Sequence, residues 1–105
     1  MARRYRVGAL DDIKPGNLRR VDPNGVPVCL VRLLSGEVHA LSDICSHEYI
    51  ELSDGDLDGD EVECPAHGSR FSVATGQVSG LPANEPVAVY PVVVDGDDVF
   101  VELSE

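Results

Sequence analysis

Short runs of valine and leucine, separated by clusters of turn-forming residues, set the pattern of this chain. No long apolar stripe has the 3.6-residue spacing of an amphipathic helix, so the pattern favours strands. The expected strands occupy residues 4–9, 18–21, 26–33, 38–41, 87–94 and 98–103. The pattern predicts an all-β fold, either a small sandwich or a barrel.

Two groups of turn residues fall between pairs of these runs. Asp22-Pro23-Asn24-Gly25 and Asp95-Gly96-Asp97 each predict a hairpin. Pro91 lies inside the run 87–94 and has no backbone N–H, so an edge position or a bulge is expected there. A length of 105 residues predicts a single domain, 1–105.

The middle third of the chain differs from both ends. From residue 42 to about residue 80 the apolar runs are short and turns such as Asp54-Gly55 and Thr75-Gly76-Gln77 are frequent. The stretch CSHEYIELSDGDLDGDEVECPAHGSRF, residues 45–71, holds two of the three cysteines and two of the three histidines. Because such a segment buries little apolar surface by itself, we expect something other than apolar packing to hold it together.

Charge and targeting signals narrow the classes of partner. Nineteen acidic and eight basic residues give a net charge of −11, which disfavours binding to nucleic acid and to anionic lipid. The chain has no run of about 18 apolar residues, so the sequence predicts no membrane-spanning helix. The start, MARRYRVGALDD, lacks the apolar stretch of a secretory signal, so we expect a cytoplasmic protein.

The cysteine count points towards metal rather than disulfides. Three cysteines cannot all be paired within one chain, and no export signal is present. Cys29 lies in the apolar run VPVCLVRLL and is expected to be a small buried hydrophobic residue. His39 has no partner at ligand spacing and is expected to be an ordinary strand residue.

Calcium is one metal that the residues suggest and then exclude. Asp54, Asp56, Asp58 and Gly59 match the first half of an EF-hand loop. The twelfth position, where a glutamate should complete the coordination, is Pro65, and the flanks are strand-like rather than helical. We expect the acids to form a solvated face that can serve in docking: Asp54, Asp56, Asp58, Asp60, Glu61 and Glu63.

Two metal sites remain open on the ligand types. Cys45-x-His47 and Cys64-x-x-His67 would give zinc two sulfur and two nitrogen ligands, although a C-x-H pair is unusual in structural zinc sites. The same residues would also suit a [2Fe–2S] cluster in which two cysteines hold one iron and two histidines hold the other.

A known family carries this double motif. C-S-H at 45–47 and C-P-A-H-G at 64–68, with sixteen residues between them, resemble the two cluster-binding loops of Rieske iron–sulfur proteins. The resemblance implies one [2Fe–2S] cluster held by Cys45, His47, Cys64 and His67. It also implies the Rieske fold, an antiparallel β-sandwich base into which a cluster-binding subdomain of two loops is inserted from about 42 to 73.

Departures from other Rieske proteins suggest which kind this is. Membrane-anchored members have a further cysteine in each loop, where this chain has Ile50 and Ala66. Oxygenase α subunits continue into a large catalytic domain, which we do not expect here. The chain is most similar to the small Rieske ferredoxins of multicomponent aromatic-ring dioxygenases.

That similarity implies an electron carrier rather than an enzyme. Such a ferredoxin takes one electron at a time from an NAD(P)H-dependent flavin reductase and delivers it to the terminal oxygenase. The alternatives are a small Rieske subunit of another oxidoreductase, such as a nitrite reductase, and a zinc-stabilised structural module.

The resemblance also assigns supporting roles. Ser69 stands where high-potential relatives have a serine that bonds a cluster sulfide, and Phe71 stands where they have a tyrosine hydroxyl. Without that hydroxyl and the loop disulfide, we expect a low potential for a Rieske centre. Pro65 and Pro82 are expected to shield the cluster beside its exposed tip. The chain is expected to be a monomer that docks partners at this tip through these residues: His47, His67, Pro65, Pro82, Glu48, Asp56 and Asp58.

Overall fold

The computed structural model describes residues 2–46, 49–65, 68–79 and 85–104. In these ranges the chain forms ten strands, all paired antiparallel, with three 3₁₀ turns and no α-helix. The strands are β1 (Ala2–Ala9), β2 (Asn17–Val21), β3 (Val28–Arg32), β4 (Val38–Ser42), β5 (Asp56–Asp58), β6 (Glu61–Glu63), β7 (Arg70–Ser72), β8 (Val89–Tyr90), β9 (Val92–Asp95) and β10 (Asp98–Ser104). The 3₁₀ turns are η1 (Leu10–Asp12), η2 (Pro23–Gly25) and η3 (Leu52–Asp54). Within the described residues, none of the helical segments has the length and apolar character of a membrane span.

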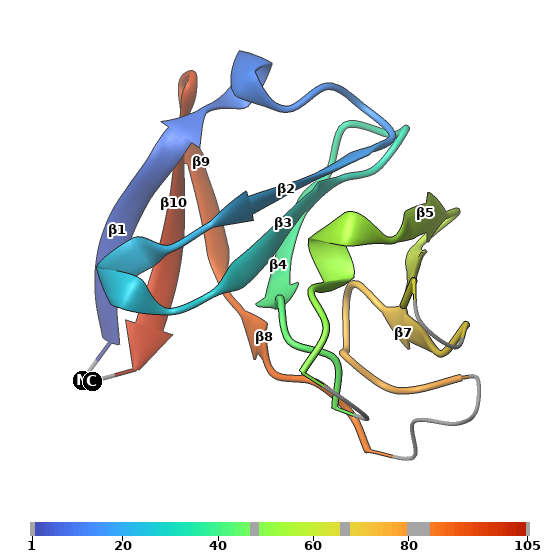
Figure 1. Cartoon of the computed structure of the whole chain (residues 1–105). Helices are drawn as coiled ribbons and strands as arrows, with labels where there is room; N and C mark the ends of the chain where they lie inside the picture. Colours follow the sequence, from blue (N-terminus) through green and yellow to red (C-terminus); the bar gives the residue numbers. More distant parts are fainter. Residues whose placement is uncertain (1, 47–48, 66–67, 80–84, 105) are drawn as a thin grey trace.

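Two sheets form the base of the molecule (Figure 1). One has the strand order β1-β10-β9, and the other has the order β2-β3-β4-β8. Ala2 pairs with Ser104, so the two ends of the chain lie side by side. Alternate residues of facing strands pack into one hydrophobic cluster between the sheets: Val28, Leu30, Ala40, Val99, Val101 and Leu103, with Ile13. The predicted antiparallel sandwich base is confirmed.

Strand β3 is buried on both faces. Val28 and Leu30 point into the cluster between the two base sheets, whereas Cys29 and Val31 belong to a second cluster. This alternation follows from the two-residue period of a strand. The second cluster lies between β3–β4 and the middle third of the chain, and it includes Leu52, Val62 and Phe71. One strand therefore joins the base to the segment that carries both sequence motifs.

The middle third forms a third, smaller sheet of order β5-β6-β7. Val62 pairs with both Leu57 and Phe71, and the side chains of Val62 and Phe71 are fully buried. Figure 1 shows this sheet beside η3, on the side of β3 and β4 away from β1 and β10.

The prediction of a single strand over 87–94 is wrong. The chain forms β8, which pairs with β4, and then β9, which pairs with β10, so the run is divided between two sheets. Pro91 stands between the two strands and has no N–H for either ladder, while its carbonyl accepts the Glu102 N–H at 3.0 Å. The break lets the chain leave one base sheet and join the other.

Both predicted hairpins are present, with one shift of boundary. Asp95 pairs directly with Asp98, and Gly96 has a positive φ of 62° in the turn between them. In the other hairpin, Pro23–Gly25 forms η2 and β3 begins only at Val28, two residues later than expected. Asn24 and Gly25 both have positive φ, which extends the turn.

Candidate metal centre

The first predicted ligand loop is the tip of a hairpin that leaves β4 and returns at η3. Ile44 and Glu51 form an isolated antiparallel bridge, and the Cys45 N–H donates to the Ile50 carbonyl at 2.9 Å. The Cys45 side chain is buried, with 3% of its surface exposed. No strand of the described chain flanks this loop beyond that one bridge and the end of β4.

The second predicted ligand loop joins β6 to β7. Glu63 and Arg70 face each other as the last pair of the ladder, and the Cys64 N–H donates to the Ser69 carbonyl at 2.7 Å. The Gly68 N–H turns back to the Cys64 carbonyl at 3.1 Å, and Gly68 has a positive φ of 79° that suits glycine. Cys64 is also buried, again with 3% exposed.

The two loops are therefore built alike. In each, the cysteine N–H bonds the carbonyl five residues later, and in each the thiol enters the same hydrophobic cluster, which also contains Cys29. None of the three cysteines, all of which the structure describes, forms a disulfide. Two buried sulfurs in matched loops fit a soft metal or an iron–sulfur cluster.

The nitrogen half of the predicted ligand set lies outside the described residues, because it consists of His47 and His67. Among residues 2–46, 49–65, 68–79 and 85–104, no three His, Cys, Asp or Glu side chains come close enough to share a metal ion. The described part of the site thus supplies the two sulfur donors, and the four-residue ligand set stays a prediction.

The residues predicted to surround the cluster differ in burial. Ser69 and Phe71 are buried, with 1% and 0% exposed, whereas Pro65 is exposed at the surface of the second loop. Ser69 follows the loop that begins at Cys64 and closes it through its own carbonyl. Their predicted effects on a cluster stay predictions.

Of the predicted docking residues, Asp56 and Asp58 lie exposed on β5, while Glu48 and Pro82 fall outside the described residues. The Asp58 carboxylate lies 2.5 Å from Nη1 of Arg70 on β7. Nη2 of Arg70 also lies 3.0 Å from the Glu63 carboxylate. The acidic face therefore carries one basic residue that the sequence reasoning did not use.

Tyr49 is a second residue that the sequence reasoning missed. It belongs to the first loop, and 84% of its surface is exposed, although an aromatic side chain normally gains by burial. Its position two residues after His47 was the available signal, since an aromatic residue in a polar loop is enriched at interfaces.

Asp43 is the third residue that the sequence reasoning missed, and its side chain is fully buried. Its carboxylate accepts hydrogen bonds from the Ser53 N–H at 2.7 Å and the Ser53 hydroxyl at 2.9 Å. Burial raises the pKa of Asp43 above its ordinary value, and the two bonds from Ser53 oppose that shift. An aspartate at a strand end looks like a surface residue in the sequence, so nothing there indicated its burial.

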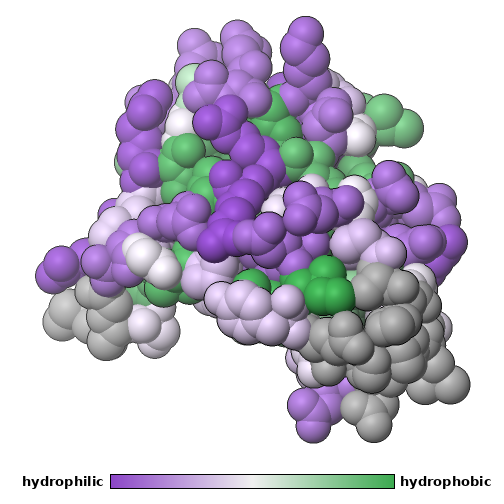
Figure 2. Space-filling view, viewed as in Figure 1, coloured by the Kyte–Doolittle hydropathy of each residue, from purple (hydrophilic) through white to green (hydrophobic). Residues whose placement is uncertain are grey.

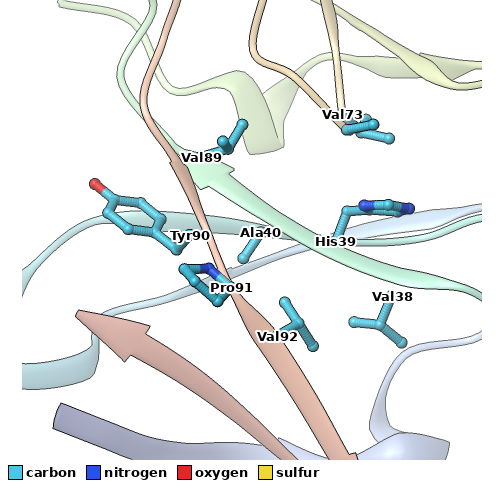
Figure 3. A pocket seen from close by; sticks show the side chains of 9 residues that line it. Val38, His39, Ala40, Val73, Val89, Tyr90, Pro91 and Val92 are labelled. Atoms are coloured by element: carbon cyan, nitrogen blue, oxygen red, sulfur yellow. The ribbon is translucent and has the colours of Figure 1, made fainter. Parts of the chain in front are cut away.

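A shallow hollow of about 340 Å³ lies elsewhere in the molecule, where β4 meets the β8–β9 junction (Figure 3). His39 faces it from β4, with Nε2 3.3 Å from the Glu37 carboxylate, which agrees with its predicted role as a strand residue. The lining is mainly small and apolar: Val38, His39, Ala40, Val73, Ala74, Val89, Tyr90, Pro91 and Val92. Neither Cys45 nor Cys64 lines it, so it is separate from the paired loops.

Comparison with known proteins places these loops in context. The family model for the Rieske [2Fe-2S] domain matches residues 3–91. Ferredoxin CarAc of Metapseudomonas resinovorans is 38% identical over 91% of this chain and 90% of its own length. The 3-phenylpropionate/cinnamic acid dioxygenase ferredoxin subunit of Escherichia coli K12 is 40% identical over 90% of this chain and 88% of its own.

Solved structures agree with the sequence relatives. A chain in the complex of reduced oxygenase and oxidized ferredoxin of carbazole 1,9a-dioxygenase superposes with a TM-score of 0.87 and 38% identity, covering 92% of this chain and 99% of that one. A structure described as an NADH-dependent nitrite reductase small subunit from Mycobacterium tuberculosis has a TM-score of 0.89 and covers 100% of this chain and 98% of that one. Its identity is 24%, so it shares the fold alone.

Proposed function

We propose that this chain, which belongs to the Rieske [2Fe–2S] family, is the electron-carrying ferredoxin of an aromatic-ring dioxygenase system. It would take single electrons from an NAD(P)H-dependent flavin reductase and pass them to a terminal oxygenase. The observation that carries the proposal is the pair of matched loops that bury Cys45 and Cys64 in one cluster. A relative named as a dioxygenase ferredoxin subunit matches it along nearly its whole length.

Four residues would hold the cluster: Cys45 and Cys64 on one iron, His47 and His67 on the other. When bound, this cluster accepts and releases one electron reversibly. The chain contributes the burial of both thiols, which keeps water from the sulfur side. It also contributes the two closed loops, in which a hydrogen bond from each cysteine N–H fixes the backbone.

The chain's own side chains also support a low reduction potential for a Rieske centre. Phe71 is fully buried and offers no hydroxyl to a sulfur, and Ile50 and Ala66 cannot form a disulfide between the loops. Hydrogen bonds to cluster sulfurs raise the potential, because they favour the more negative reduced state. Ser69, which is buried and lies at the end of the loop that Cys64 begins, is proposed to donate such a bond and so to raise the potential in part.

The partners are proposed to dock at the loop tips. His47 and His67 would form the electron's exit, with Pro65, Pro82 and the exposed Tyr49 as contact surface. Glu48, Asp56 and Asp58 would form an acidic rim that orients a basic partner and gives fast, salt-sensitive complexes. In the carbazole system a similar chain is found in a complex with its oxygenase.

The remaining proposals concern the protein's setting. We place the 105 residues in one domain with a cluster-binding subdomain from about 42 to 73, acting as a monomer in the cytoplasm without nucleic-acid or membrane partners. The relatives belong to systems named for 3-phenylpropionate/cinnamic acid and for carbazole, and an electron carrier does not itself contact the aromatic substrate.

Metal and sulfide analysis of the purified protein tests the proposal, with two cysteine variants as a matched pair. Cys64→Ala should lose the two irons and two sulfides, while Cys29→Ala should keep them, although both cysteines are buried in the same cluster. The dithionite-reduced wild type should give a paramagnetic resonance spectrum whose average g value lies below that of an all-cysteine cluster.

A colourless protein that contains zinc would refute the electron-carrier proposal. A cluster that is retained in Cys64→Ala would refute the ligand assignment. Reduction of the purified protein by its own flavin reductase, followed by turnover of the terminal oxygenase, would separate the dioxygenase role from that of a nitrite reductase subunit.

A further inference from the structure

The first ligand loop lacks the support that the second one has. The second loop closes a regular ladder, in which β6 pairs with β7 over three residue pairs and with β5 on its other side. The first loop is closed by the single Ile44–Glu51 bridge. Backbone pairing alone therefore holds Cys45 less firmly than Cys64.

A buried carboxylate stands at the base of this weaker hairpin. Asp43 precedes Cys45 by two residues, and its side chain accepts both the N–H and the hydroxyl of Ser53, on the returning arm. Its backbone takes part in two bonds. The Leu52 N–H donates to the Asp43 carbonyl at 2.6 Å as part of the Ile44–Glu51 bridge, and the Asp43 N–H donates to the Pro27 carbonyl at 3.1 Å. Four hydrogen bonds thus converge on one residue at the loop base.

The base sheet supplies the matching positive charge. Nη1 of Arg20, on β2, lies 3.8 Å from the Asp43 carboxylate and also pairs with Glu51, which follows the loop. A buried carboxylate is costly unless it is hydrogen-bonded and paired, and Asp43 has both kinds of partner. The network ties both arms of the first hairpin to β2 of the base.

We propose that Asp43 is a positioning residue that fixes the first ligand loop, and with it Cys45, in the geometry that a [2Fe–2S] cluster requires. The proposal rests on the proposed function, because it gives Asp43 a role towards the same cluster. Asp43 does for the first loop what the β6–β7 ladder does for the second. Removing it should loosen the cluster on the Cys45 side without dissolving the base sandwich.

The test compares four variants of the cluster-loaded protein. Asp43→Ala removes both side-chain bonds, Ser53→Ala removes only the hydroxyl bond, and Asp43→Asn keeps an oxygen that can accept the Ser53 N–H. Glu61→Gln is the matched control, because Glu61 accepts the Ser79 hydroxyl at 2.5 Å in a similar bond on the exposed face of the third sheet. The readouts are the paramagnetic resonance g values of the reduced protein, the rate of iron release to a chelator, and the thermal midpoint.

We expect iron release to be about tenfold faster in Asp43→Ala and a few-fold faster in Ser53→Ala, in line with the loss of two bonds and of one. The g values should shift in both. Asp43→Asn should keep g values and a rate of iron release close to those of the wild type. The rate of iron release in Glu61→Gln should match that of the wild type within about twofold. Ser53→Ala decides the outcome if Asp43→Ala does not fold.

Unchanged g values and iron release in Ser53→Ala and Asp43→Ala, with only a lower thermal midpoint, would overturn the proposal, since Asp43 would then be a structural residue alone. An equal effect in Glu61→Gln would overturn it as well. If the wild type itself contained no [2Fe–2S] cluster, the proposed function would fail first, so the two failures can be told apart.

Discussion

At the scale of single residues, Cys29, Cys45 and Cys64 share one hydrophobic cluster but occupy different kinds of backbone. Cys29 lies within β3, where its neighbours on both sides are paired in ladders. Cys45 and Cys64 each open a tight loop. A thiol at a loop start can meet a group held between two loops, whereas a thiol within a central strand is surrounded by packed side chains.

This difference has a consequence for alkaline stability. Burial, with the Asp43 charge adding to it, raises the pKa of Cys29 far above its ordinary value of 9.0. The unfolded thiol ionises near pH 9 while the folded thiol stays protonated, so folding stability is lost as pH rises above that value. We expect the free energy of unfolding of the wild type to fall by up to about 1.4 kcal/mol per pH unit because of Cys29.

Thermal unfolding of the wild type and Cys29→Ala between about pH 8 and about pH 10 measures this effect. The variant should be less stable at every pH because of the cavity, but its midpoint should fall less steeply. Parallel curves for the two proteins would show that Cys29 is not protected from ionisation.

Tyr49 offers a test of docking at the same scale. Tyr49 and Leu34 are almost equally exposed, at 84% and 83%, but only Tyr49 lies in a ligand loop. Tyr49→Ala should raise the Michaelis constant of the oxygenase for this protein about tenfold, as loss of an interface aromatic does. Leu34→Ala should leave the constant unchanged, and equal effects of the two substitutions would argue against the tip as the contact surface.

At the scale of elements, the position of the second ligand loop depends on close contact between strands. Gly55 ends the η3 turn just before β5, and a Cβ atom there would overlap the carbonyl oxygen of Glu63. Glu63 immediately precedes Cys64, so any shift of its carbonyl moves a predicted ligand. Gly59, in the β5–β6 turn, has open space around it but a positive φ of 62°.

Substitution of these two glycines separates close packing from backbone strain. Gly55→Ala should destabilise the protein by about 3 kcal/mol and reduce cluster content, because the third sheet must open. Gly59→Ala should cost about 1 kcal/mol through its backbone conformation and leave the cluster content unchanged. Denaturant unfolding and iron analysis measure both effects, and normal iron in a destabilised Gly55→Ala would uncouple β5 from the second loop.

At the scale of the whole molecule, charge is distributed unevenly. Residues 42–73 hold nine acids and one arginine, and so carry −8 of the net charge of −11. Figure 2 shows hydrophilic residues in a band across one face, with smaller hydrophobic areas between them. Arg70 pairs with Asp58 and Glu63 through side chains more than a third exposed, so water screens these pairs and they stabilise the fold little. The acidic surface is therefore available to steer a partner.

Reversing three of these charges tests that steering. Asp56, Asp58 and Asp60 changed to lysine should slow electron delivery about tenfold at low salt and have little effect at high salt, where charges are screened. The reduction potential should stay nearly constant. Asp11, Asp95 and Asp97 changed to lysine make the same change in net charge on the base, and an equal loss of rate there would assign the effect to net charge alone.

Prediction from the sequence succeeded where local patterns dominate. The strands over 4–9, 18–21, 38–41 and 98–103 all appear, because valine and leucine alternation between turn residues is a local signal. The run 87–94 was assigned wrongly, since only the positions of two separate sheets decide where a proline breaks it. Asp43 gave no local signal and Tyr49 gave only its place in a polar loop, because burial and exposure depend on residues far along the chain.

By itself the sequence determined the all-β class, the acidic middle third and the spacing of two cysteines and two histidines, since composition and spacing are properties of the chain. Only the tertiary structure decided that β3 is buried on both faces and that Cys45 and Cys64 enter one cluster. It also decided that the buried Asp43 carboxylate accepts hydrogen bonds from Ser53, on the returning arm of the first hairpin. These features arise from contacts between segments distant in sequence, and a local pattern carries no information about which distant segment will cover it.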